Sequence, residues 1–219
     1  MRNKRTGKKG QMAIKLDISK AYDRVEWAFL QQIMLKLGIN GRWVRLAMET
    51  VHTASYSILI NGEPKGYITP SRGIKQGDPL SPYLFLLCVD GLSSLIRKTA
   101  ESQQLHGILS CTNGVCISYL LFVDDSFIFC QATMEEGQRL LEILGQYEAT
   151  SRQAINRQKA SIFFSRNTSQ AIKTYIQGLF GAQIMEDCES YLGLPMVGGK
   201  SKVNTFKDLQ ERITKRFMG

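Results

Sequence analysis

Two adjacent acids, Asp124 and Asp125, stand between two apolar, aromatic-rich segments of the chain. These segments, residues 119–123 and 126–130, have the composition of β-strands, which predicts that the two acids form a two-residue hairpin turn. Such turns favour Asn-Gly or Asp-Gly, because their backbone needs positive φ, so two like charges are a poor local choice. Crowded carboxylates are commonly stabilised by a divalent cation, which binds oxygen ligands well. The pair therefore indicates a metal site, and a solvated acidic turn is the alternative that these residues alone leave open.

Asp17 is the third acid that could share this chemistry. It follows a short strand candidate, residues 13–16, and precedes a helix. If that strand lies beside the hairpin, the carboxylate of Asp17 can reach Asp124. Three carboxylates around two divalent ions suit in-line phosphoryl transfer, in which one ion activates the attacking hydroxyl and the other stabilises the leaving pyrophosphate. Taken alone, Asp17 is more typical of a helix N-cap.

The composition favours a nucleic-acid partner. The chain has 219 residues, of which 43% are apolar, so it can form one large packed domain or a domain and part of another. Its 28 Lys and Arg against 19 Asp and Glu give a net charge of +9. A basic surplus of this kind indicates a polyanionic partner, most often nucleic acid.

The cysteines and histidines do not have the spacing of a zinc site. The five cysteines include no C-x-x-C pair, and His52 and His106 are far apart. An odd number of cysteines favours reduced thiols in an intracellular protein. The longest apolar run, residues 83–89, is too short to span a bilayer, and the start of the chain has no apolar signal region. We therefore expect no membrane partner.

Hydrophobic spacing predicts helices and strands that do not alternate strictly. Predicted helices lie around residues 25–37, 44–51, 82–96, 136–147, 172–179 and 206–217; predicted strands lie around residues 13–16, 56–60, 67–69, 119–123, 126–130, 161–164 and 191–196. Ser81 is the expected N-cap of the third helix, Thr133 with Glu136 forms a capping box, and Gly181 ends the fifth helix. Asn61-Gly62, between the strands at residues 56–60 and 67–69, predicts a hairpin turn. This order predicts an α+β fold whose mainly antiparallel sheet has helices on one face.

Five motifs, in order along the chain, resemble those of the reverse transcriptases of non-LTR (LINE-type) retrotransposons. Their sequences are most similar to those of the plant members. The first four are similar to segments 13–27 (AIKLDISKAYDRVEW), 72–82 (RGIKQGDPLSP), 122–125 (FVDD) and 156–161 (NRQKAS). The fifth, segment 191–195 (YLGLP), resembles the primer grip. A single pair of acids is a weak signal, whereas five motifs in the order of the family are a strong one.

This resemblance implies a fold and a division into parts. It implies a polymerase palm with a ferredoxin-like core, together with part of the fingers and the start of the thumb. Residues 1–10 would be a basic lead-in, residues 11–197 the palm with partial fingers, and residues 198–219 the first helix of the thumb or connection. The motifs that precede the palm in the family, including most of the fingers, are expected to lie upstream of this chain. For that reason we expect little primer extension by the chain on its own.

The resemblance also assigns the metal ligands. Asp17, Asp124 and Asp125 would hold two Mg²⁺ ions, for which Mn²⁺ can substitute, with the backbone carbonyl of Ile18 as a further ligand. Val123 stands where the family usually has Ala, beside the primer end, which we interpret as a change that tunes activity and does not abolish it.

Other positions would contact the substrates. Tyr22 would be the steric gate that excludes the 2′-hydroxyl of a ribonucleotide, although a core tyrosine is the alternative. Gln76 and Gly77 would lie against the incoming nucleotide and the template, in a segment that also fits an ordinary loop before a helix. Lys159 would face the pyrophosphate, or would simply be solvated.

The primer grip would be formed by Tyr191, Leu192 and Gly193. The implied partners are an RNA template, a DNA primer and deoxynucleoside triphosphates, and the implied location is a nuclear or cytoplasmic ribonucleoprotein. Two functions follow: an RNA-directed DNA polymerase core, or an inactive retrotransposon remnant that keeps the fold and binds nucleic acid weakly. The oligomeric state does not follow from the sequence.

Overall fold

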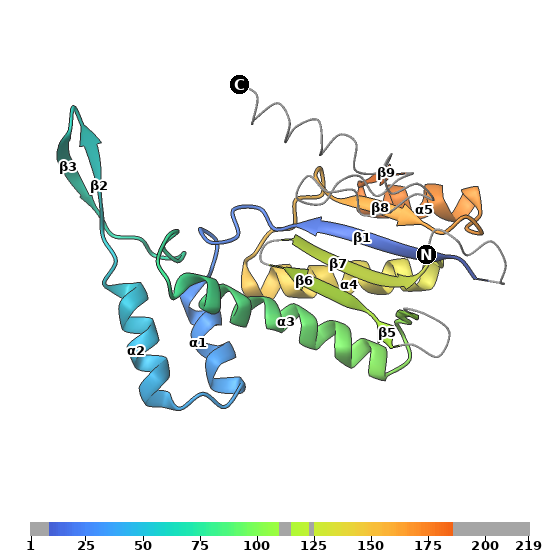
Figure 1. Ribbon diagram of the computed structural model, residues 1–219, viewed down its shortest axis with the longest axis horizontal. Helices are drawn as coiled ribbons and strands as arrows, with labels where there is room; N and C mark the ends of the chain where they lie inside the picture. Colours follow the sequence, from blue (N-terminus) through green and yellow to red (C-terminus); the bar gives the residue numbers. More distant parts are fainter. Residues whose placement is uncertain (1–8, 110–114, 123–124, 186–219) are drawn as a thin grey trace, which may run out of the picture.

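A computed structural model describes residues 9–109, 115–122 and 125–185 of the chain. Over these residues it contains five helices and nine strands (Figure 1). The helices are α1 (Trp27–Lys36), α2 (Gly41–His52), α3 (Ser81–Glu101), α4 (Met134–Ser151) and α5 (Gln170–Phe180). The strands are β1 (Gln11–Asp17), β2 (Tyr56–Ile60), β3 (Glu63–Ile68), β4 (Ile108–Leu109), β5 (Cys116–Ile117), β6 (Tyr119–Phe122), β7 (Asp125–Gln131), β8 (Ser161–Phe164) and β9 (Gln183–Met185).

The main sheet has five strands in the order β6-β7-β1-β8-β9. The pairs β6–β7, β7–β1 and β1–β8 are antiparallel, and only β8–β9 is parallel. Along the chain these elements follow the order β1, α3, β6, β7, α4 and β8. In the sheet, β7 lies between β1 and β6, and β1 lies between β7 and β8. This is the split β-α-β unit of ferredoxin-like sheets. The predicted α+β class and mainly antiparallel sheet are confirmed.

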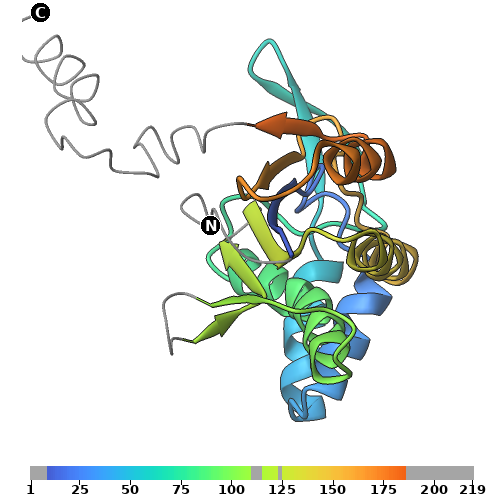
Figure 2. The same cartoon turned by 90° about the vertical axis from the view of Figure 1, so that its right-hand side faces the viewer.

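One face of the sheet carries the main hydrophobic core. Met12, Ile14 and Leu16 of β1 are buried against α3, α4 and α5, together with Ile128 of β7 and Ile162 of β8. Figure 2 shows α4 and α5 side by side on this face. Because side chains alternate along a strand, the odd-numbered residues of β1 lie on the opposite face, which these helices do not cover. That alternation separates the packing residues of β1 from the residues available for chemistry.

A second core joins α1, α2 and α3 to the loop that follows β1. Its buried residues include Ile18, Val25, Leu30, Val44 and Phe85. From this part of the molecule the β2–β3 hairpin projects away from the main sheet (Figure 1), and every residue of its two strands is exposed. The predicted hairpin at Asn61-Gly62 is confirmed, and both of these turn residues have the positive φ that it needs.

Several predicted element ends need correction. The N-cap of α3 is Leu80 and not Ser81, which is the first helical residue, and Asp78 Oδ1 accepts from the backbone N–H of Leu80 at 2.8 Å. Thr133 caps α4 by accepting from the N–H of Glu136 at 3.2 Å. The carboxylate of Glu136 does not complete the capping box: it accepts from the N–H of Gln131 and contacts the His106 ring instead. The N–H of Thr133 donates instead to the carbonyl of Gln131 at 3.0 Å.

Two predicted elements fall near the end of the chain, and three short strands of the structure were not predicted. The strand predicted at residues 191–196 and the helix at residues 206–217 lie outside the described residues. Spacing did not predict β4, β5 and β9, which have only two or three residues each. No helix in the described part of the chain is both long and apolar enough to cross a membrane.

Candidate active site

Asp17 is the last residue of β1 and lies directly opposite Asp125, the first residue of β7. The backbone carbonyl of Asp17 accepts from the N–H of Asn156 at 2.8 Å, on the β8 side of β1. The N–H and C=O of one strand residue point to the same side, so those of Asp17 point away from β7. Asp17 and Asp125 therefore form a non-hydrogen-bonded pair, the type in which opposing Cα atoms are closest, about 4.5 Å apart.

Phe122 pairs with Asp125. The predicted turn of Asp124 and Asp125 is therefore wrong by one position, because Asp125 is already the first residue of β7, and two residues connect the strands. Val123 and Asp124 are those two residues and lie outside the described residues, as does the side chain of Asp125. Among the side chains that the structure describes, no group of three His, Cys, Asp or Glu residues could hold a metal ion. The predicted metal site thus depends on the carboxylates of Asp124 and Asp125, which the structure does not describe.

Lys159 is the charged neighbour of Asp17. Its Nζ atom lies 3.7 Å from Oδ2 of Asp17, with 69% of the lysine side chain and 26% of the aspartate side chain exposed. The structure thus brings together the first and fourth sequence motifs. An exposed ion pair of this kind contributes little to stability, about 0–1 kcal/mol, so a stronger ligand can separate it.

The backbone carbonyl of Ile18 points towards the β7 side of β1. Ile18 forms an antiparallel bridge with Ile155, and the hydrogen bonds of that bridge are made by its neighbours. Ser19 N–H donates to Ala154 at 2.8 Å, and Asn156 N–H donates to Asp17 at 2.8 Å. In a bridge of this type the central residues direct their own polar groups away from each other. This direction is compatible with the predicted role of Ile18 as a carbonyl ligand.

Tyr22 lies in the loop after β1 and is half-buried. Its ring stacks on Phe85 of α3, with centroids 5.2 Å apart and planes 16° apart. Its carbonyl accepts from the N–H of Ile74 at 3.0 Å, and the N–H of Gly73 donates to Val25 at 2.8 Å. These bonds attach the second motif to the loop of the first. No contact of the described residues tests the predicted steric-gate role.

Gly73 makes that attachment sterically feasible. It has φ of +87°, and a Cβ atom there would lie 3.0 Å from the carbonyl oxygen of Asp23. Only glycine accommodates both the left-handed backbone and the close approach without strain.

Gln76 and Gly77 follow on the exposed side of this segment. Gln76 lines a hollow of about 380 Å³ at the foot of the β2–β3 hairpin, with Arg72, Lys75 and Tyr56 among the other lining residues. Two cations and an aromatic ring are the groups that bind phosphates and bases in single-stranded nucleic acids. Tyr22 does not line this hollow.

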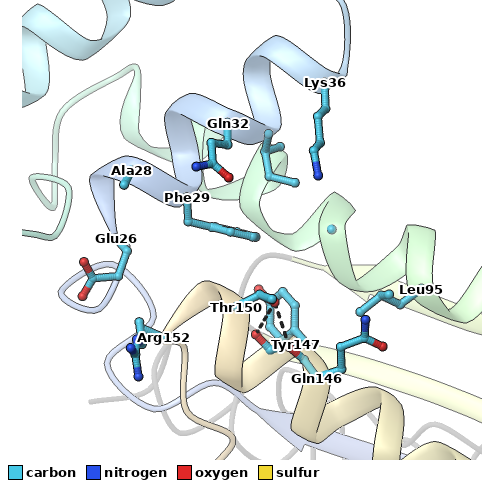
Figure 3. Close-up of a pocket in the computed structure, with 12 residues that line it drawn as sticks. Glu26, Ala28, Phe29, Gln32, Lys36, Leu95, Gln146, Tyr147, Thr150 and Arg152 are labelled. Carbon is cyan, nitrogen blue, oxygen red and sulfur yellow. Dashed lines mark hydrogen bonds between the residues drawn. The ribbon is translucent and has the colours of Figure 1, made fainter.

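A separate hollow of about 450 Å³ lies between α1, α3 and α4, on the helical side of the sheet (Figure 3). Phe29 and Leu95 contribute apolar surface, while Glu26 and Arg152 line the end near the start of α1. Asp17 does not line it, and it is not part of the candidate site.

Buried thiols take no part in the site. Burial raises the pKa of the Cys88 thiol to about 12. The pKa of Cys130 is raised well above its usual value, first by burial and then by the negative charge of Glu136. Thiols that stay protonated at neutral pH are neither nucleophiles nor metal ligands. Cys88, Cys116 and Cys130 are free cysteines, in agreement with the expected reduced thiols.

One predicted site lies outside the described residues, and one set of contacts near Asp17 was not predicted. Tyr191, Leu192 and Gly193 of the predicted primer grip lie outside the described residues. Sequence reasoning missed Glu148 and Gln153, which bind main-chain atoms near Asp17: Glu148 accepts from Ile155 N–H, and Gln153 donates to the carbonyl of Ala21. No spacing signal could have found them, because their partners are backbone groups, which carry no sequence signal.

The fold superposes on those of two solved telomerase structures. Telomerase from Candida tropicalis, truncated from its C-terminal domain, superposes with a TM-score of 0.57 and 14% identity over 76% of this chain and 33% of that one. Telomerase from Candida albicans, in complex with a fragment of telomeric RNA, superposes with a TM-score of 0.54 and 13% identity, over 73% of this chain and 27% of that one. The fold is therefore reverse-transcriptase-like.

The family described as "Reverse transcriptase (RNA-dependent DNA polymerase)" matches residues 1–196. The chain belongs to this family, so its lineage is that of RNA-directed DNA polymerases.

Relatives confirm the resemblance to retrotransposon enzymes. The chain is 32% identical over 112 residues to the Pol polyprotein of the type-1 retrotransposable element R2 of Popillia japonica, covering 51% of this chain and 18% of that protein. It is 30% identical over 119 residues to its counterpart from the type-2 element R2DM of Drosophila melanogaster, covering 54% and 10%. It is also 54% identical over 68 residues to an uncharacterized mitochondrial protein of Arabidopsis thaliana, covering 31% and 56%. The chain thus spans about a tenth to about half of the length of these relatives.

Proposed function

We propose that this chain is the palm of an RNA-directed DNA polymerase, with part of the fingers and the start of the thumb. It joins the primer 3′-hydroxyl to the α-phosphate of a deoxynucleoside triphosphate and releases pyrophosphate. The pairing of Asp17 with Asp125, on the sheet face away from the helices, carries this proposal. In this pair, the acid of the first motif lies opposite one acid of the third motif.

Asp17, Asp124, Asp125 and the carbonyl of Ile18 would hold two Mg²⁺ ions, or Mn²⁺ in their place. The described residues fit such ions in three respects. The carboxylate of Asp17 is partly exposed, it already faces a cation in Lys159, and the Ile18 carbonyl points to the same side as β7. When bound, the ions supply an activated hydroxyl and neutralise the charge that develops on the phosphates.

Residues of this chain would then orient the substrates. Lys159, next to Asp17, would supply positive charge to the leaving pyrophosphate. Gln76 and Gly77 would contact the nucleotide and the template beside the hollow that Arg72 and Lys75 line. Tyr22 would occupy the space below the sugar and exclude the 2′-hydroxyl.

The remaining partners follow from the same reaction. The RNA template and the DNA primer would bind the basic chain, whose net charge is +9. Tyr191, Leu192 and Gly193 would grip the primer end. We propose that the protein works in a nuclear or cytoplasmic ribonucleoprotein, because an enzyme of this type copies an RNA that it must hold.

The test combines metal binding with primer extension. Mn²⁺ binding by the 219-residue chain, Asp17→Asn and Asp124→Asn is measured by electron paramagnetic resonance, and DNA synthesis is measured on an RNA template with a DNA primer. We expect the wild-type chain to bind Mn²⁺ and both variants to bind it at least tenfold more weakly. Synthesis that Asp124→Asn abolishes supports the polymerase. Metal binding by the chain, with no synthesis even by a version extended upstream with the fingers motifs, supports the inactive remnant. Equal Mn²⁺ binding by all three chains overturns the metal site.

A further inference from the structure

The segment that connects α4 to β8, residues 152–160, pairs with the end of β1 on its β8 side. We call it the α4–β8 connection. Its carbonyl at Ala154 accepts from Ser19, and its N–H at Asn156 donates to the carbonyl of Asp17, each at 2.8 Å. Between these bonds Ile155 bridges Ile18. The backbone of Asp17 is therefore held from one side by this connection.

The connection also reaches the loop after β1 and Lys159. The buried side chain of Gln153 donates from Nε2 to the carbonyl of Ala21 at 3.3 Å. The N–H of Lys159 donates to the backbone oxygen of Asn156 at 3.2 Å and to its Oδ1 atom at 3.3 Å. One short segment thus fixes the backbone position of Asp17 and that of Lys159, which pairs with it.

Glu148 of α4 fixes this connection in place. Because Ile155 is the central residue of its bridge, its own N–H points away from β1 and needs another acceptor. Glu148 Oε1 accepts that bond at 2.8 Å, while its Oε2 atom lies 3.4 Å from Arg157 Nη2. The Glu148 side chain is 24% exposed, so a bond between its charge and a backbone N–H is only partly weakened by water.

We propose that Glu148 is a positioning residue for the carboxylate of Asp17, acting through the α4–β8 connection; this rests on the proposed function. Removing the carboxylate leaves the Ile155 N–H without its acceptor and releases the connection from α4. The end of β1 then loses the support that orients Asp17. Changes in groups that orient a metal ligand typically weaken metal binding by about 10–100-fold, and we expect about tenfold here because the effect is transmitted through the backbone.

Three variants test the inference. Glu148→Ala removes both contacts, whereas Glu148→Gln keeps a side-chain oxygen that can accept from Ile155 N–H. The matched control is Glu142→Ala, on the same helix, whose carboxylate lies 2.6 Å from Arg139 Nη1 but bonds no backbone N–H outside α4 in the described residues. Mn²⁺ affinity is measured for the full chain by electron paramagnetic resonance, and hydrogen exchange is measured over residues 152–160.

We expect Glu148→Ala to bind Mn²⁺ about tenfold more weakly and to exchange faster over residues 152–160, with Glu148→Gln and Glu142→Ala within about twofold of wild type. Wild-type affinity in Glu148→Ala, or an equal loss in Glu142→Ala, overturns the positioning role while leaving the metal site intact. If the wild-type chain itself binds no Mn²⁺, the proposed metal site fails. Faster exchange in Glu148→Ala would then reduce Glu148 to a structural residue and overturn the inference as well.

Discussion

The Nζ atom of Lys159 lies 3.7 Å from Oδ2 of Asp17, so the cation of the fourth motif forms an ion pair with the acid of the first motif. The same carboxylate is proposed to bind metal, and the same ammonium is proposed to face pyrophosphate. The two roles compete for one contact. When metal and nucleotide bind, the ion pair would therefore have to break, or Asp17 and Lys159 would have to keep contact with each other while they also contact the metal and the pyrophosphate.

Lys159→Met should affect metal and nucleotide binding in opposite directions. Loss of an exposed ion pair releases at most about 1 kcal/mol, so Mn²⁺ affinity should rise by no more than about fivefold. Triphosphate affinity should fall, because a positive charge near the pyrophosphate is lost. Calorimetric titration with Mn²⁺ and with a deoxynucleoside triphosphate checks both, and Lys15→Met, on the same face of β1, is the control. A parallel fall in both affinities would contradict the competition.

Asp17→Asn should remove the thermal stabilisation that Mg²⁺ confers. A ligand that binds only the folded state stabilises it by RT ln(1 + [L]/Kd), about 2.7 kcal/mol at one hundred times Kd. For a chain of this size that corresponds to a rise in Tm of roughly 5–11 °C. Thermal unfolding is compared in EDTA and in saturating Mg²⁺.

The same experiment examines the Asp17–Asp125 pair. Without metal, Asp17→Asn should be as stable as wild type or more stable by up to about 1 kcal/mol, since like charges opposite each other destabilise a sheet. A rise in Tm with Mg²⁺ that is equal in both proteins would place the metal elsewhere.

In a version of the chain extended upstream with the fingers motifs, Tyr22→Ala should raise ribonucleotide incorporation relative to deoxyribonucleotide incorporation in primer extension. Removing the ring opens the space that the 2′-hydroxyl would need, and it also loses the stacking on Phe85, worth about 0.5–1.5 kcal/mol. Tyr22→Phe keeps the ring and should keep the discrimination. An unchanged ratio in Tyr22→Ala would leave Tyr22 as a packing residue of the second core.

Gly73→Ala should destabilise the protein more than Gly62→Ala does. Both glycines have left-handed backbones, with φ of +87° and +84°, so both substitutions carry about 1 kcal/mol of backbone strain. Only at Gly73 would the new Cβ meet backbone, 3.0 Å from the Asp23 oxygen, whereas nothing lies within 4 Å at Gly62. Urea unfolding should show a difference of about 1–3 kcal/mol. Equal losses would mean that the loop around Asp23 moves freely.

Local signals in the sequence predicted most elements, because they depend on neighbouring residues. Apolar spacing located α1 to α5, Asn61-Gly62 predicted the β2–β3 hairpin, and Gly181 ends α5 as expected, with φ of +61°. Element ends were less predictable, since the partner of a cap can come from far along the chain. Glu136, predicted to complete a capping box, instead serves Gln131 and His106.

The sequence by itself determined the family, because five motifs in a fixed order can be recognised without knowing which residues are in contact. Only the tertiary structure decided what faces Asp17: Asp125 across the sheet, Lys159 at 3.7 Å, and a connection held by Glu148. Strand pairing brings residues together that are more than a hundred positions apart, and backbone groups, which carry no sequence signal, make most of the supporting bonds. For that physical reason the acids could be read from the chain, whereas the groups that orient them could not.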